Sequence, residues 1–464
     1  MVTGRAIRRA TAALAALSAV ALAPGAVGTA SAAGTDIEDV PRYTTAPDAV
    51  PVKGRAGAAD APEIGTGTYT DAIGRGERKY YTVPLDAKST AYFSVVAAPP
   101  PGTKVEDHAD RIKISVQDAD GTICDREADP AFRADGTAYP IADHATRGVD
   151  GDSARCRSAG AYYLVVSREG PATSGPQAWP IEITHLSEPG LKGTPPAAPT
   201  EGSWPSATPP PPASGTKRQA RGGSGFHNAG SVGTGLWRDR IRPGESRFYR
   251  VPVDWGQRLN VSAELPDAAG GAGIAKALGV TAYNPARGVI DDDTFVFYDG
   301  RPAASKLFTA PVAYGNRFAA SDEVRAVRVA GWYYLEVTLH PDAARFFPRG
   351  ADLTLRVDVR GAARPGPGYA GPAGDFSVRP GGQEAAEEGL PAPRPDGGGN
   401  LRTLGYAGIG TGAVLLAALG AWTLRVRRTS VADDPALSAQ AHAAEPTRSG
   451  PRAPGIPPGW SGRR

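Results

Sequence analysis

Two stretches of the chain share one alternation of apolar and polar positions. Residues 64–86 read IGTGTYTDAIGRGERKYYTVPLD and residues 232–254 read VGTGLWRDRIRPGESRFYRVPVD, with 11 identities in 23 gap-free positions. In the first stretch Tyr81, Val83 and Leu85 alternate with more polar neighbours, and a period of two is typical of a strand with one face in a core. The match resumes at GAYYLVV and GWYYLEV, which begin at Gly160 and Gly331. Two copies of one β-domain, each about 130 residues long, are the simplest explanation.

Short strands separated by Gly, Pro and Asp turns, without long amphipathic helices, predict an all-β fold of two tandem antiparallel β-sandwich or jelly-roll domains. We expect domain 1 at 64–187 and domain 2 at 231–361. Pro- and Gly-rich sequence predicts a linker at 188–230 and a stalk at 362–403, both extended spacers. Residues 34–63 carry little pattern and are expected to form a flexible N-terminal segment.

The two ends of the chain predict export and anchoring. Residues 1–33 have an Arg-rich start, an apolar stretch and small residues at 30–33, as in a secretory signal peptide. Residues 404–424 carry no charge and would span roughly 31 Å as a helix, enough for a bilayer core. Arg425, Arg427 and Arg428 follow at once, which places 425–464 inside the cell as a disordered cytoplasmic tail. A single-pass type I protein of the cell membrane, with extracytoplasmic domains, is therefore predicted.

Charge and cysteine content narrow the classes further. The 51 basic and 48 acidic residues give a net charge of +3, so a nucleic-acid partner gains no support. Cys124 and Cys156 are the two cysteines, and an even pair in an oxidising compartment predicts one disulfide bond.

The repeated strands resemble a known family. Tyr-Tyr-Thr-Val-Pro-Leu-Asp at 80–86 and the closing Gly-Ala-Tyr-Tyr-Leu-Val-Val at 160–166 look like bacterial pre-peptidase C-terminal domains, which are small jelly-roll modules of secreted proteins. The family's Asp-x-Asp-Leu-Tyr run is missing from the middle strand of both copies, which argues against a calcium site of the family's kind. The overall layout resembles membrane-anchored cell-surface proteins of actinobacteria.

Two groups of acidic residues are candidate calcium ligands, because hard cations prefer several converging oxygens. Asp118, Asp120 and Asp125 form one, and Asp291, Asp292 and Asp293 form the other, at what we take to be the equivalent place in copy two. Solvated hairpin turns, where Asp and Gly are common for backbone reasons, are the favoured alternative.

Paired aromatic residues on the strands are candidate binding groups. In each adjacent pair one ring should face the core and the other should face outward, where it could stack on a sugar or anchor a protein. We assign the outward role to Tyr80, Tyr162, Phe248 and Trp332. Cross-strand packing within the sheet is the plainer alternative.

A catalytic set is not evident. His108, Asp110 and Ser153 match a serine protease triad by residue type, but the Gly-Gly that should follow the serine is replaced by Ala-Arg. The sequence therefore predicts a non-catalytic cell-surface protein whose duplicated β-domains bind another extracellular protein. A cell-wall glycan-binding module is the first alternative, and a secreted hydrolase, or an accessory to one, is the second.

Overall fold

The computed structural model describes residues 40–150, 156–197, 215–292, 294–379 and 381–389. These residues fall within one compact unit that ends at Ala392. No helix in the described ranges is long and apolar enough to cross a membrane. The predicted signal peptide, the span at 404–424 and the tail at 425–464 lie outside the described residues, so these stay predictions.

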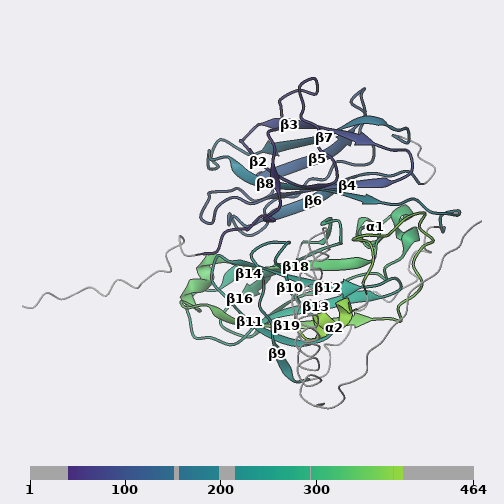
Figure 1. Cartoon of the computed structure of the whole chain (residues 1–464). Helices are drawn as coiled ribbons and strands as arrows, with labels where there is room; N and C mark the ends of the chain where they lie inside the picture. Colours follow the sequence, from purple (N-terminus) through teal and green to yellow (C-terminus); the bar gives the residue numbers. More distant parts are fainter. Residues whose placement is uncertain (1–39, 151–155, 198–214, 293, 380, 390–464) are drawn as a thin grey trace, which may run out of the picture. The chain divides into compact units, whose positions relative to one another are not determined.

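Domain 1 (Val50–Glu188) is a sandwich of two sheets, which Figure 1 shows as separate layers. One sheet has the order β1-β2-β8-β4-β6 and the other has the order β3-β7-β5. All of the neighbouring strands run antiparallel except the β1–β2 pair. The strands are β1 (Val50–Pro51), β2 (Gly67–Ile73), β3 (Arg78–Leu85), β4 (Thr90–Ala97), β5 (Arg111–Gln117), β6 (Ile141–Arg147), β7 (Gly160–Glu169) and β8 (Trp179–Glu188).

Domain 2 (Lys217–Arg360) is a second sandwich, with sheets β17-β13-β19-β11-β9 and β10-β12-β18-β14-β15, the latter with β16 also paired to β14. Its strands are β9 (Lys217–Gln219), β10 (Gly230–Ser231), β11 (Gly235–Ile241), β12 (Ser246–Val253), β13 (Arg258–Leu265), β14 (Ile274–Tyr283), β15 (Val289–Asp291), β16 (Val296–Tyr298), β17 (Ala303–Phe308), β18 (Gly331–Leu339) and β19 (Ala351–Arg360). Short helices lie at Tyr314–Phe318 and Pro341–Arg345 (both 3-10), α1 (Asp322–Ala326) and α2 (Gly382–Glu387).

The two sandwiches share one topology, which confirms the all-β tandem fold. The order β2-β8-β4-β6 in domain 1 recurs as β11-β19-β13-β17, and β3-β7-β5 recurs as β12-β18-β14. Register also agrees, since Thr82 pairs with Tyr163 in the first copy and Arg250 pairs with Tyr334 in the second. Each copy has its own core, filled by the inward residues of facing sheets.

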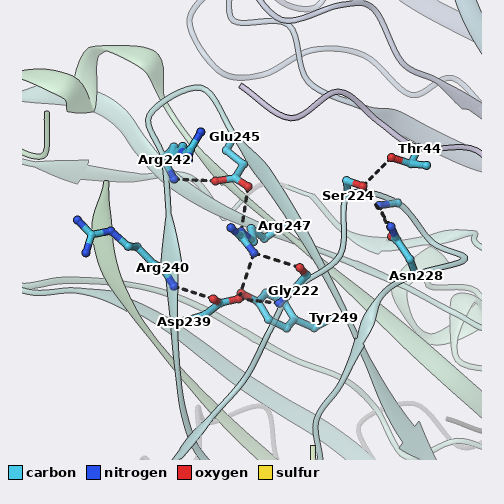
Figure 2. A network of polar contacts seen from close by, with 11 residues as sticks. Thr44, Gly222, Ser224, Asn228, Asp239, Arg240, Arg242, Glu245, Arg247 and Tyr249 are labelled. Carbon is cyan, nitrogen blue, oxygen red and sulfur yellow. Dashed lines mark hydrogen bonds and ion pairs between the residues drawn. The ribbon is translucent and has the colours of Figure 1, made fainter. Parts of the chain in front are cut away.

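A buried polar contact is duplicated with the fold. In domain 2, the Asp239 carboxylate accepts hydrogen bonds from the Gly222 backbone N–H at 2.6 Å and the Tyr249 hydroxyl at 2.8 Å (Figure 2). In domain 1, Asp71 receives the equivalent bonds from Gly54 at 2.9 Å and Tyr81 at 2.8 Å. Asp71 of β2 therefore ties the incoming chain to β3, and Asp239 of β11 ties it to β12, because a largely buried carboxylate needs donors.

The ordered domains extend beyond the expected bounds. Residues 50–51 pair with β2, residues 217–219 pair with β11 and Gly230 pairs with β12, although the sequence predicts a flexible segment or linker at each of these places. Part of the expected stalk also packs on domain 2, since Phe376 is buried and α2 contacts β12. These segments gain order from tertiary contacts, and they are too short for a readable period of their own.

Candidate functional site

The outer face of the β12-β18-β14 sheet is buried against domain 1. Phe248 of β12 and Tyr283 of β14 form a cluster with Val96 and Ala142 of domain 1. Phe226, from the segment that leads into domain 2, lies over the same face with its ring centroid 5.1 Å from that of Tyr283. The N-terminal strap, residues 40–49, adds Tyr43, whose ring lies 5.8 Å from that of Phe248. Strand β4 is buried along its whole length because it faces its own core on one side and this contact on the other.

Charged side chains surround this apolar centre. Glu182 of β8 accepts from the Arg287 guanidinium at 2.5 Å and from the Ala46 backbone N–H of the strap at 2.8 Å. Glu188, at the end of the same strand, accepts from Arg317 at 2.8 Å and from the Tyr92 hydroxyl at 2.7 Å. A buried ion pair is stable only when further hydrogen bonds satisfy the remaining oxygens of the carboxylate. Both glutamates accept such additional bonds.

Electrostatics and burial act together on these groups. Burial works against the charge of Arg287 and of Arg317, but the facing Glu182 and Glu188 outweigh it, so the pKa of each arginine is raised. Burial, reinforced by the nearby Glu182 carboxylate, raises the pKa of the Tyr43 hydroxyl. The arginines therefore remain charged inside the contact, and Tyr43 remains a hydrogen-bond donor there.

Arg287 has a left-handed backbone conformation, with φ of 61°. It stands in the turn after β14, where the Asn284 backbone N–H donates to the Gly288 carbonyl at 2.9 Å. The equivalent turn after β5 places Gly121 at this position, with φ of 81°. A non-glycine residue in this region costs about 1–2 kcal/mol, so the Glu182 ion pair is made from a strained backbone position.

Glu336 is a further buried acid on this face, in the middle of β18. The Tyr283 hydroxyl donates to its Oε2 at 2.9 Å, and no described residue hydrogen-bonds its Oε1. Burial raises the pKa of Glu336 to about 8. The carboxyl group is therefore mostly protonated at neutral pH, because burial disfavours its charged form.

Domain 1 has a more exposed counterpart of the buried face. In the β3-β7-β5 sheet, Tyr80 stands where Phe248 stands in domain 2, and Tyr163 stands where Tyr334 stands. Both tyrosines are partly exposed. The residue aligned with Phe226 is Ala58, which has no ring to lay over the sheet. The face that packs on domain 1 in one repeat is thus left partly exposed by the described residues in the other.

The four aromatic residues predicted to face outward have different positions. Tyr80 is partly exposed on the free face, whereas Phe248 is buried at the contact between the domains. Trp332 is partly buried, with the Arg250 guanidinium 4.8 Å from its ring centre. Tyr162 lies in the core of domain 1 instead, and its neighbour Tyr163 is the outward residue.

The register explains the reversed order within this pair. Tyr162 is paired with Val83 across the β3–β7 ladder, and directly opposed residues point to the same face of a sheet. Val83 is a core residue, so Tyr162 faces the core with it. The outward assignment of Tyr162 was therefore wrong.

The predicted acidic groups belong to different kinds of turn. Asp118 Oδ1 accepts from the backbone N–H groups of Asp120 and Thr122, at 3.0 and 2.8 Å, which closes the hairpin turn. Asp125 is exposed nearby. The equivalent turn in domain 2 is formed by Asn284, so the assignment of Asp291–Asp293 to that place was wrong.

In domain 2, Asp292 pairs with Arg133 of domain 1 at 2.9 Å, Asp291 ends β15, and Asp293 lies outside the described residues. Among the described residues, no three acidic, His or Cys side chains gather as ligands for a metal. Calcium binding stays a prediction.

The disulfide prediction is confirmed by a bond between Cys124 and Cys156. Of the triad-like residues, Asp110 is buried and accepts from the Ser174 hydroxyl and from the Glu106 backbone N–H at 2.8 Å. His108 has a left-handed backbone, with φ of 58°, in the preceding turn, and Ser153 lies outside the described residues. Asp110 therefore has a structural role in fixing the loop before β5.

A scan against protein-family models and a search of curated proteins found no match. Solved structures that align include the CUB1-EGF-CUB2 domain of human MASP-1/3, at 7% identity and a TM-score of 0.16, over 63% of this chain and 99% of that one. A CBM22 tandem domain from Paenibacillus barcinonensis Xyn10C aligns at 9% identity and 0.17, over 64% and 92%. A putative secreted protein from Parabacteroides distasonis aligns at 9% and 0.16, over 71% and 94%. Scores this low support no conclusion about function, and the resemblance to pre-peptidase C-terminal domains stays a prediction.

Proposed function

We propose that the chain is a non-catalytic, membrane-anchored cell-surface protein that binds another protein through the outer face of the β3-β7-β5 sheet. The anchoring rests on the sequence of the two ends. The binding face rests on one structural observation, namely that the equivalent face in the second repeat already packs against protein.

The duplicated face supplies the physical argument. In domain 2, two outward aromatic residues, Phe248 and Tyr334, lie in or against the cluster that packs on domain 1. Domain 1 keeps aromatic residues at both positions, as Tyr80 and Tyr163, without a covering domain in the described part of the chain. Tyrosine combines a large apolar ring with a hydroxyl that stays hydrated, which suits a surface that is exposed until a partner binds.

The contacts between the domains would present this face in a fixed orientation. Two buried ion pairs, Glu182–Arg287 and Glu188–Arg317, join domain 1 to domain 2 on the opposite side of domain 1. A fixed orientation of the two domains reduces the entropic cost of binding a partner. We therefore expect the two sandwiches to act as one body with one free face of this kind.

Glycan binding is the second candidate, and a row of three side chains across the free face of domain 1 favours it. Thr82, Tyr163 and Gln117 are paired neighbours on three adjacent strands, so that a hydroxyl and an amide flank one ring. Sugar-binding surfaces combine a ring with polar groups of this kind. The protein alternative is preferred because the equivalent face of the second repeat packs on protein.

Photo-crosslinking on intact cells separates these candidates. A photoreactive residue replaces Tyr163 in the full-length chain, and the matched control carries it at Lys306, an exposed position on β17 of domain 2. The proposal expects one discrete protein adduct from position 163 that Tyr80→Ser reduces and that position 306 does not give. An adduct that resists protease and yields to glycan hydrolysis would favour the second candidate, and equal adducts from both positions would contradict both.

A further inference from the structure

His144 of β6 is a buried titratable group at the contact between the domains. Its Nε2 lies 2.9 Å from a terminal nitrogen of Arg328, which also donates to the Thr146 hydroxyl at 2.9 Å. Arg328 stands just before β18, in domain 2. Because a guanidinium only donates, the Nε2 atom of His144 must accept and must carry no proton.

The imidazole ring of His144 is closely packed by residues of both domains. A Cβ atom added to Gly288 of domain 2 would lie 1.7 Å from His144 Nδ1, so this glycine is required by the close approach. The Tyr92 ring lies 5.5 Å away on the neighbouring strand β4. The imidazole is therefore packed between Gly288 and Tyr92 while its Nε2 faces Arg328.

Several charged groups face His144 and Arg328. Asp143 Oδ1 lies 3.5 Å from His144 Nδ1 and also accepts from the Val289 backbone N–H of domain 2 at 3.0 Å. Asp125, from the disulfide-bonded loop, favours the protonated imidazole, and Arg328 opposes it. Arg325, also near Arg328, adds positive charge on the side of domain 2.

We propose that His144 and Arg328 form an acid-sensitive lock between the two domains. Protonation of Nε2 would place an N–H group against the Arg328 guanidinium. Two donors and two positive charges would then face each other in a buried contact. The nearby Asp143 offsets part of this repulsion but lies on the Nδ1 side of the ring. The contact is therefore favoured by neutral His144 and weakened by its cation.

The direction of the pH effect follows from the burial. Burial lowers the pKa of His144 below its ordinary 6.5, so a separated domain 1 takes up the proton more readily than the closed form. The contribution of neutral His144 to the closed form is fully present above about pH 6.5 and is lost as the pH falls below that value, whereas Glu336, whose pKa is raised on the same face, acts in the opposite direction. Separation would uncover Phe248 and Tyr334, the counterparts of Tyr80 and Tyr163. The lock is independent of the proposed binding at the β3-β7-β5 face.

Hydrogen–deuterium exchange of the full-length chain tests the lock. The reporter is a peptide that spans 284–292, which contains the Val289 N–H bonded across the contact, and the reference is a peptide from β7 inside domain 1. Every chain carries Glu336→Gln, so that this acid no longer titrates in the contact. After correction for intrinsic exchange, we expect the reporter to exchange about tenfold faster at about pH 5 than at about pH 7. The reference should not change.

Two variants assign the response to His144. His144→Gln keeps an acceptor for Arg328 without a titrating group, and Arg328→Gln removes the facing cation, so both should abolish the acid response of the reporter. The matched control His185→Gln changes a buried histidine that stacks on Phe93 in the core of domain 1, and it should keep the response. A reporter that is insensitive to acid in the Glu336→Gln chain, or a response that both interface variants retain in that chain, would overturn the proposal.

Discussion

Glu182 of domain 1 and Arg287 of domain 2 form an ion pair 2.5 Å long in which both side chains are almost fully buried. The two domains are therefore joined by a buried contact and are not independent of each other. This holds although the segment that connects them includes the Pro-rich sequence at 198–214. The strap adds to this contact, because the Ala46 backbone N–H donates to the same carboxylate.

Removal of one partner of this pair should destabilise the protein strongly. Glu182→Ala leaves Arg287 buried without its carboxylate, and we expect a loss of about 3–5 kcal/mol in the free energy of unfolding. Urea unfolding followed by tryptophan fluorescence measures it. The matched control is Glu264→Ala, which breaks the partly exposed pair with Arg356 and should cost no more than about 1 kcal/mol. Equal losses in the two variants would show that the buried pair has no special role.

The strained backbone at Arg287 gives a second prediction. Arg287→Gly and Arg287→Ala both remove the ion pair, but only glycine adopts the left-handed conformation without strain. We expect the glycine variant to be about 1 kcal/mol more stable than the alanine variant. Thermal unfolding of the two proteins side by side decides this, and an alanine variant at least as stable as the glycine variant would argue against the strain.

Glu336 predicts a loss of stability in alkaline solution. Its pKa in the folded protein is about 8, above the ordinary 4.5, so its contribution is fully present below about pH 4.5 and is lost as the pH rises through 8. Glu336→Gln keeps the size and a donor but cannot ionise, and it should flatten the decline in unfolding free energy between about pH 6 and pH 9. Glu264→Gln on the surface is the control. The idea fails if the wild type and Glu336→Gln share one pH profile.

The disulfide should matter for stability. Cys124 and Cys156 are 32 residues apart, and the chain-entropy model assigns about 3–4 kcal/mol to a loop of this length. The double variant Cys124→Ser, Cys156→Ser should lose that amount in chemical unfolding under oxidising conditions. Addition of reductant should lower the stability of the wild type to the same level and leave the variant unchanged. A double variant as stable as the oxidised wild type would contradict this role.

Local sequence was enough to predict the repeat, the strand pattern and the disulfide. Tyr81 and Tyr249 occupy matching positions in a period-two pattern, and both are buried in their cores as the pattern requires. Such features depend on neighbours within one strand or one loop, which the sequence displays directly.

The contact between the domains could not be predicted in this way. Glu182, Glu188 and Arg317 are charged residues at positions that a single strand or loop would show as solvent-facing, and only the packing of a second domain buries them. The sequence did contain one signal of this contact, in the turns that follow β5 and β14. Gly121 corresponds to Arg287 in the structure, and an alignment of the two turns that matches them shows an arginine at a glycine-type position.

The central claim, a free protein-binding face on β3-β7-β5, is tested most directly by binding to cell-envelope fractions. Purified full-length chain is compared with the Tyr80→Ser, Tyr163→Ser double variant, and each envelope fraction is used before and after protease digestion. The account predicts binding by the wild type that the double variant loses by about tenfold or more, a loss of about 1.4 kcal/mol, and that digestion of the envelope abolishes. Binding that is unchanged in the double variant would contradict the assignment of this face.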